Sequence, residues 1–196
     1  MELDEIDADD DLGAAIALFD QELRRLGVYD DMQTDARPGI LTDELRRRLA
    51  AAGEEELYSE DLATLMAWHD GVISIHLPRE LTTLDQGLAA MADARADDVP
   101  FGDQWFQVGR DMGGGRFVMD CGLNPSPLYL RHPEYVQSFP WGMSFPQIEA
   151  IAHLFRLWVF CYEKDIYGPF EGYVGGTATD LQRCEVLRGS PFWHFF

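Results

Sequence analysis

The sequence predicts a single α+β domain over residues 1–196, in which helices lie before and after a central antiparallel sheet. Apolar residues recur at helical spacing early in the chain, alternate from about Pro100, and return to helical spacing after Ser144. Helices, then a meander of strands, then helices is an element order typical of α+β domains. The chain has 196 residues, of which 46% are hydrophobic, and this is enough for one sizeable core.

The first helix is predicted over residues 12–26, where apolar side chains recur every three or four positions. Gly27 is suited to end it, because glycine is common directly after a helix. Residues 29–39, YDDMQTDARPG, are expected to form a loop. Thr42 is then predicted to cap a short helix with two leucines on its inner face.

Ser59 is predicted to cap the next helix. Glu60 and Asp61 follow in the first turn, where the helix dipole favours negative charge. His69 is expected on the inner face of this helix, beside leucine and methionine. Asp70 and Gly71 are expected to close it, since glycine tolerates the left-handed conformation of a helix end.

A strand and a further helix are predicted next. Residues 72–77, VISIHL, are rich in β-branched side chains and alternate, which favours a strand. Residues 83–86, TLDQ, have the spacing of a capping box, in which the first and last side chains bond each other's backbone amides. We expect the helix that follows to turn its leucines and methionine inward.

Four short strands are predicted in the second half of the chain, because polar and apolar residues alternate there between clusters of glycine and proline. They cover residues 104–108, 116–121, 127–131 and 134–139. Three consecutive glycines, residues 113–115, separate the first two. A phosphate-binding loop of the Walker type would need lysine and Ser or Thr after the glycines and would lead into a helix. Here a strand pattern follows, so we predict the tip of a hairpin.

The longest helix is predicted to begin at a second capping box, residues 144–147, SFPQ. Its inner face carries large apolar side chains: Ile148, Ile151, Phe155, Trp158, Val159 and Tyr162. The remaining residues, 165–196, are rich in glycine and aromatic residues, with a last short helix expected near Thr179. Because the final PFWHFF is strongly apolar, we expect this tail to pack on the domain.

The net charge is the main compositional signal. Asp and Glu total 35 against 15 Lys and Arg, which gives a formal charge of −20. Such a surface repels nucleic acid and anionic membranes and attracts basic proteins, although the charge can also serve solubility alone. The acidic start, residues 1–11, lacks the pattern of a secretory signal, and no apolar run is long enough to cross a bilayer. We therefore expect a cytoplasmic protein; whether residues 1–11 are ordered stays open.

Patterns of catalytic or metal-binding residues are weak. The three cysteines are scattered and form no C-x-x-C pair, so buried thiols in a reducing compartment are expected. The pairs His69 with Asp70 and His132 with Glu134 could serve catalysis, but a hydrogen-bonded structural histidine is the more common situation. Asp111 and Asp120 flank the predicted hairpin, and their carboxylates could do acid–base work or bind a cation if they were buried together. We predict no enzyme activity, no metal and no cofactor, with a small metal-dependent hydrolase kept as an alternative.

Several motifs occur in an order that resembles the SUKH superfamily, the Smi/Knr-like proteins. A helix ending in WHDG is followed by WFQVGRDMGGGRFVMD, then by PLYLRH, and then by a closing amphipathic helix that starts with SFPQI. The matching segments are residues 62–71, 105–120, 127–132 and 144–159. The acidic start and the aromatic tail lie outside the match.

The resemblance implies an α+β fold and a function by protein binding. Bacterial members of this superfamily are often immunity proteins that neutralise toxins such as nucleases and deaminases, and fungal members regulate cell-wall synthesis. On this basis we predict a bacterial immunity protein that binds a basic toxin, with a regulatory or scaffolding protein of the cell envelope as the alternative. The contact residues are predicted at motif positions expected to face solvent: Asp70, Asp111, Asp120 and Trp141.

Overall fold

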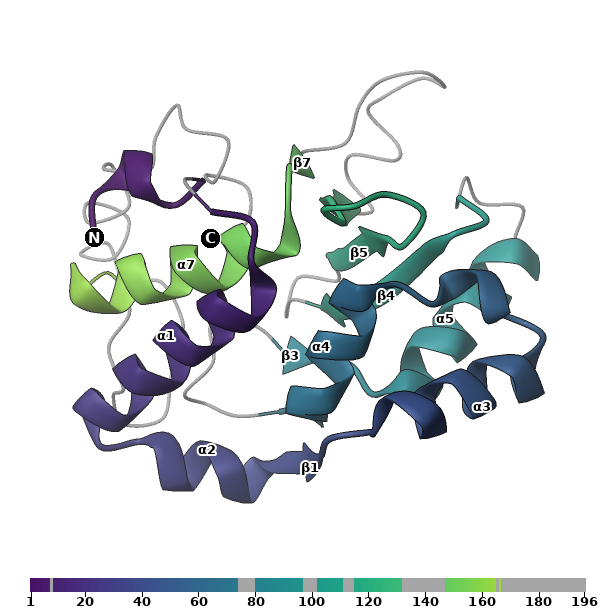
Figure 1. The fold of residues 1–196 in the computed structure, drawn as a ribbon, viewed down its shortest axis with the longest axis horizontal. Helices are drawn as coiled ribbons and strands as arrows, with labels where there is room; N and C mark the ends of the chain where they lie inside the picture. Colours follow the sequence, from purple (N-terminus) through teal and green to yellow (C-terminus); the bar gives the residue numbers. More distant parts are fainter. Residues whose placement is uncertain are drawn as a thin grey trace.

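The fold of this protein was analysed in a computed structural model, which describes residues 1–7, 9–73, 80–96, 102–110, 115–131, 147–164 and 166. The predicted α+β class is confirmed. Helices surround one antiparallel sheet, with α1 and α7 packed together at one end and α3 and α5 at the other (Figure 1).

The first helix follows the prediction, but the segment after it does not. Helix α1, Leu12–Leu26, begins where the Asp11 side chain accepts a hydrogen bond from the Ala14 amide at 2.9 Å. It ends at Gly27, whose φ of 75° is the left-handed conformation expected there. The predicted loop is instead a helix, α2 (Tyr29–Asp35), followed by strand β1 (Ala36–Pro38). Met32 is the one buried residue of α2 and is fully buried, so its packing holds in place a helix that has no strong sequence pattern.

Helices α3 (Thr42–Ala52) and α4 (Glu60–Trp68), with the short 3-10 turn η2 (Glu55–Leu57), form the next part of the core. Thr42 is the first residue of α3 rather than its cap. Ser59 caps α4 as predicted and accepts a hydrogen bond from the Leu62 amide at 3.1 Å. The predicted end of α4 is wrong, because the helix stops at Trp68 and the next residues pair with β1 as strand β2 (His69–Val72).

The strands form a meander in which each pairs with the next along the chain, in the order β1 to β7. The remaining strands are β3 (Glu80–Leu81), β4 (Trp105–Arg110), β5 (Arg116–Asp120), β6 (Leu128–Arg131) and β7 (Gln147–Ile148). Strands β4 and β5 are antiparallel neighbours with Arg110 opposite Arg116, so the glycine-rich stretch joins a hairpin and does not lead into a helix. The predicted strand at residues 134–139 and most of that at 72–77 lie outside the described residues.

Two long helices complete the core. Helix α5 (Leu84–Ala96) begins at the predicted capping box: the Thr83 amide donates to Gln86 Oε1 at 2.9 Å, and the Gln86 amide donates to Thr83 Oγ1 at 3.1 Å. Helix α7 (Ile151–Glu163) packs along α1, and Phe19 of α1 lies 5.8 Å from Phe155 and 5.4 Å from Trp158 between ring centroids.

The predicted start of α7 at residues 144–147 is wrong. Gln147 and Ile148 pair with β6 as strand β7, and the helix begins three residues after them. The five predicted inner-face residues that lie in α7 are all buried, whereas Ile148 is buried as part of β7 instead. The predicted tail packing and the short helix near Thr179 lie outside the described residues.

The acidic start of the chain is placed against α7 (Figure 1). It contains a short 3-10 turn, η1 (Leu3–Glu5), and Ile6 is fully buried. Basic groups of α7 and of its C-terminal cap hold its carboxylates: Lys164 Nζ, directly after the helix, lies 2.9 Å from Glu2 Oε1, and Arg156 Nη2 lies 2.7 Å from Asp9 Oδ2. The described part of residues 1–11 is therefore packed on the domain.

Candidate functional site

Asp70, the first predicted contact residue, does not face solvent. It is only 9% exposed, and its Oδ1 accepts a hydrogen bond from the Leu84 amide at the start of α5, at 2.6 Å. Its Oδ2 lies 3.7 Å from Arg48 of α3. Since α4 ends at Trp68, Asp70 belongs to the interior strand β2 and joins three elements. The expectation of a solvent-facing side chain was wrong at this position.

Asp120, another predicted contact residue, lies at the end of β5 and is partly exposed. Its carboxylate accepts hydrogen bonds from the indole of Trp105 at 3.1 Å and from the Gly122 amide at 3.0 Å. Trp105 stacks on Tyr129 of β6, with 4.9 Å between ring centroids. Burial, together with the nearby Asp120 carboxylate, raises the pKa of the Tyr129 hydroxyl. The result is a fixed carboxylate beside two partly exposed aromatic rings.

Asp111 and Trp141, the other predicted contact residues, lie outside the described residues, as do His132 and Glu134. His69 is not paired with Asp70 in the way a catalytic dyad requires. Its Nε2 lies 3.0 Å from Gln33 Nε2 and its Nδ1 lies 3.2 Å from the Arg37 carbonyl oxygen. Burial lowers the pKa of His69, because desolvation disfavours the charged imidazolium. His69 is therefore hydrogen-bonded within the fold.

Cys121 is a buried free thiol, and Cys161 is fully buried. Burial raises the pKa of Cys121 to about 12, which suppresses the reactive thiolate. In the part of the chain that the structure describes, no three His, Cys, Asp or Glu side chains are grouped to hold a metal ion. None of the described helices combines the length and apolarity needed to span a membrane.

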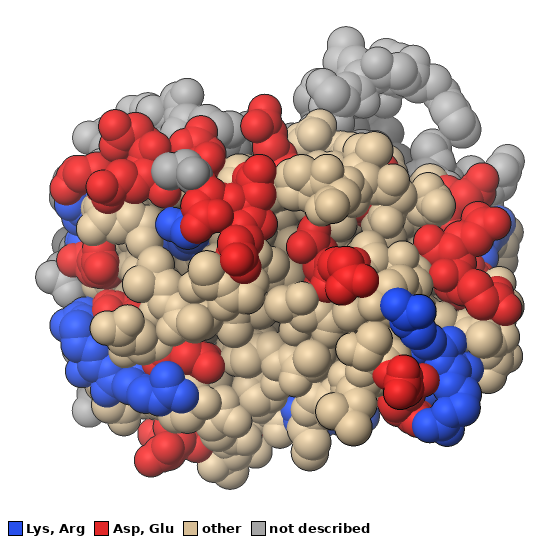
Figure 2. Space-filling view, viewed as in Figure 1, with Lys and Arg blue, Asp and Glu red and all other residues tan. Residues whose placement is uncertain are grey.

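Carboxylates dominate the surface around the N-terminal segment. Figure 2 shows acidic side chains gathered over this segment and α7, and again at the opposite end of the molecule near α3 and η2. Within residues 1–11, Glu2, Asp9 and Asp10 contact basic groups of α7, and the Asp10 contact is made with the buried His153 at 2.8 Å. Asp4 and Asp7 are exposed and have no ion pair with any described residue. The basic groups of α7 thus fix the backbone while other carboxylates stay available to a partner.

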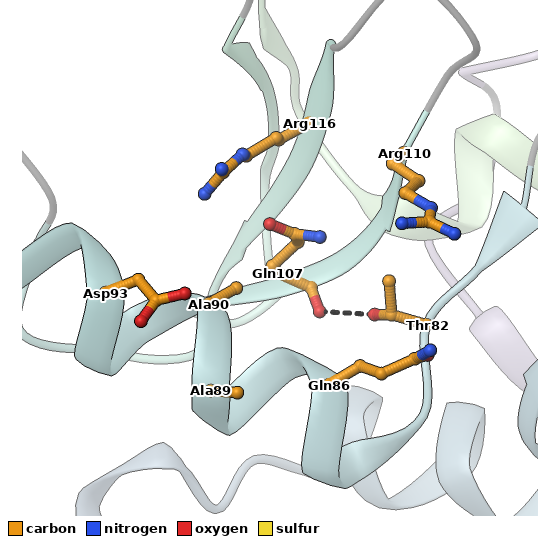
Figure 3. Close-up of a pocket in the computed structure, with 8 residues that line it drawn as sticks. All are labelled: Thr82, Gln86, Ala89, Ala90, Asp93, Gln107, Arg110 and Arg116. Carbon is orange, nitrogen blue, oxygen red and sulfur yellow. Dashed lines mark hydrogen bonds between the residues drawn. The ribbon is translucent and has the colours of Figure 1, made fainter.

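A pocket of about 390 Å³ lies between α5 and the hairpin of β4 and β5 (Figure 3). Its residues come from the segment just before α5, from α5 itself and from the two strands: Thr82, Gln86, Ala89, Ala90, Asp93, Gln107, Arg110 and Arg116. The charged residues that line it, Asp93, Arg110 and Arg116, are all exposed, so the pocket is open to solvent.

A bulge in β4 brings the polar side chains of this pocket together. Residues 107 and 110 would point to opposite faces of a regular strand, because side chains alternate. The register of β4 on β5 shifts between Gln107 and Gly109, so that Gln107 lies opposite Val118 and Arg110 opposite Arg116. An extra residue of this kind reverses the alternation beyond it. Gln107, Arg110 and Arg116 therefore share one face of the sheet.

Sequence reasoning did not find this pocket. One signal was present: Gly109 interrupts an alternating strand, which often marks a bulge. A Cβ at this position would lie 2.7 Å from the Glu80 carbonyl oxygen, so the close approach of β3 requires glycine. The partners from α5 are not identifiable from spacing, because they meet the strands only through the tertiary fold.

No model of a known protein family matches this chain, and neither does any curated protein. The similarity of its motifs to the SUKH superfamily therefore stays a prediction that rests on the order of the motifs.

Proposed function

We propose that this chain is a cytoplasmic protein-binding module of the immunity type, which neutralises a basic toxin of the nuclease or deaminase class by direct contact. The observation that carries the proposal is the acidic N-terminal segment, which is fixed on α7 and presents exposed carboxylates in a chain of net charge −20. A basic partner is attracted to such a surface over long range, and association becomes faster.

The fixed backbone of this segment supports binding as well as encounter. A disordered acidic tail would lose conformational entropy on binding, whereas a segment already held by Lys164 and Arg156 has lost most of it during folding. An ordered row of carboxylates also resembles the polyanionic substrate of a nuclease. The proposed inhibitor therefore covers a basic active site or a surface next to it.

Of the four predicted contact residues, three are kept in the proposal and one is removed. Asp120 stays in it, because its carboxylate is partly exposed and lies beside the Trp105 and Tyr129 rings, and aromatic residues are frequent anchors at interfaces. Asp70 leaves the proposed contact surface because it is buried. Asp111 and Trp141 stay predicted contact residues.

The test is capture of partners from the source organism, followed by a functional assay on what is captured. The tagged chain is expected to retain a basic protein at low salt, and co-expression of the chain is expected to relieve the toxicity of that protein in a growth assay. In the double variant Asp4→Asn with Asp7→Asn, retention and rescue should both fall.

The matched control removes two charges elsewhere, in the double variant Asp30→Asn with Asp35→Asn on α2. This variant should behave as the wild type does if the N-terminal segment is the contact surface. Equal losses in both variants would show that only net charge matters. A captured protein that is not toxic, and that acts in the cell envelope, would favour the regulatory alternative instead.

A further inference from the structure

The pocket between α5 and the β4–β5 hairpin contains two oppositely charged side chains that are not paired with any described residue. Arg116 and Asp93 line it from the strand side and the helix side, and neither has an ion pair or side-chain hydrogen bond with a described residue. Arg110, the other cation of the pocket, is already paired with Glu80, whose Oε2 lies 2.5 Å from Arg110 Nε. The available charges are thus one guanidinium and one carboxylate on facing walls.

Gln107 adds a buried hydrogen-bond acceptor to the same pocket. The residue is only 6% exposed, and its side-chain oxygen has no partner among the described groups. Its backbone is fixed, because the Thr82 hydroxyl donates to the Gln107 carbonyl oxygen at 2.7 Å (Figure 3). Figure 3 shows the side-chain oxygen turned toward the side of the pocket where Arg116 and Asp93 lie. Buried polar atoms are rarely left without a partner, so this oxygen points to a donor that the described part of the fold does not supply.

We propose that this pocket binds a small zwitterion of the α-amino-acid type. Its carboxylate contacts the Arg116 guanidinium, and its ammonium group donates hydrogen bonds to the Asp93 carboxylate and to the Gln107 side-chain oxygen. Guanidinium groups bind carboxylates through paired hydrogen bonds, and an ammonium group has three donors. The ligand satisfies all three uncommitted groups at once.

The size and charge of the pocket favour a zwitterion over a simple anion. A volume of about 390 Å³ is near the lower end for small-molecule sites, which run from about 300 to 1,000 Å³. Phosphate or sulfate would bind Arg116 but would meet the negative charge of Asp93 and would leave the Gln107 oxygen without a donor. The two alanines, Ala89 and Ala90, leave room on the helix side for the side chain of the ligand.

The first experiment uses the full-length chain and the twenty L-amino acids as probes. Binding is detected by saturation-transfer NMR on the ligand, and the best probe is then titrated by calorimetry. At least one amino acid is expected to bind. Its decarboxylated amine and its N-acetyl derivative should each bind at least about 10-fold more weakly, because a site built on polar contacts rejects analogues that leave those groups unpaired.

Variants then assign the contacts. Arg116→Gln and Asp93→Asn should each weaken binding at least about 10-fold, since each removes one of the charge-assisted contacts. Both side chains are exposed and have no described partner, so folding should be preserved. Gln107→Leu should also weaken binding while leaving the melting temperature unchanged or higher, because an apolar group replaces an unpaired polar one. The control is Arg37→Gln on β1, an exposed arginine outside the pocket, which should bind as the wild type does.

Two results would overturn the proposal. One is that no amino acid binds at millimolar concentration to the folded wild-type chain. The other is that inorganic phosphate binds more tightly than any amino acid and that Asp93→Asn strengthens its binding, which would make the pocket an anion site. Partner capture through the acidic segment is unaffected by either result, so this test and that of the proposed function fail independently.

Discussion

Replacing Gly87 with alanine tests the packing of α5 on the sheet. Gly87 lies in the interior of α5, where the helix meets Phe106 of β4. A Cβ added at Gly87 would lie 2.1 Å from Phe106 Cζ, and two further ring carbons would lie within 2.8 Å. The Phe106 ring is fully buried and has little room to move away. The same contact holds α5 at the pocket.

Two opposing effects set the magnitude. Alanine is favoured over glycine in a helix interior by about 1 kcal/mol. Overpacking a core costs about 1–3 kcal/mol, and the overlap with the whole end of a buried ring places this change near about 3 kcal/mol. The difference is a net destabilisation of about 2 kcal/mol, so the clash outweighs the gain in helix propensity.

The assay is urea unfolding of the wild type and of Gly87→Ala, followed by far-UV circular dichroism. Gly13→Ala in α1 is the control, because a Cβ there meets only Asp11 Oδ1 at 3.3 Å and stability should hold or rise. Combining Gly87→Ala with Phe106→Leu removes the end of the ring and should recover part of the loss in a double-mutant cycle. If Gly87→Ala is as stable as the wild type, the described packing of α5 on β4 is wrong.

Three further predictions concern buried polar groups. Asp70→Ala should destabilise the fold by about 1–3 kcal/mol in the same urea assay, since the Leu84 amide loses its acceptor and Arg48 loses a nearby negative charge; an unchanged midpoint would place Asp70 at the surface instead. Cys121 should resist alkylation at pH 8 in the native protein and react in guanidinium, because burial raises its pKa to about 12. Peptide mass spectrometry measures the alkylated fraction, and equal alkylation rates in the native and unfolded protein would refute the burial of Cys121. His69 has a pKa below its ordinary value of 6.5, so its contribution to stability is complete above that pH and is lost as the pH falls through the lowered pKa. His69→Gln should therefore show a smaller loss of stability than the wild type between pH 7.5 and 5, and parallel curves would mean that His69 titrates normally.

Much of the fold could be predicted from the sequence, because several elements have strong local patterns. The apolar face of α1, the Ser59 cap of α4 and the capping box of α5 at residues 83–86 are local signals that the tertiary structure leaves in place. Strands β4, β5 and β6 were also predicted near their observed positions, although their central residues are buried on both faces and do not alternate in burial.

The errors arise where tertiary pairing overrides a local pattern. The SFPQ sequence has the spacing of a helix cap, but Gln147 and Ile148 pair with β6 and delay α7. Asp70 and Gly71 have the composition of a helix end, yet β1 and β3 on either side make them part of β2. Helix α2 is short and has one fully buried residue, too few for a periodic signal.

The candidate sites show the same limit. The excess of carboxylates is visible in the composition, but the basic groups of α7 that hold the first residues are about 150 positions away in the chain. The pocket depends on a bulge in β4 and on α5, which no spacing rule connects. Contacts between distant segments are set by the packed fold rather than by neighbouring residues.

The central claim is that the acidic N-terminal segment binds a basic partner, and the salt dependence of affinity tests it most directly. The dissociation constant of the captured partner is measured by calorimetry at NaCl concentrations from about 50 to about 500 mM. Over this range the screening length of electrostatic interactions shortens severalfold. The account predicts that affinity falls as salt rises and that the Asp4→Asn with Asp7→Asn variant binds more weakly with a shallower dependence, while the Asp30→Asn with Asp35→Asn control follows the wild type. An affinity that does not change with salt, or an N-terminal variant that binds as the wild type does, would contradict it.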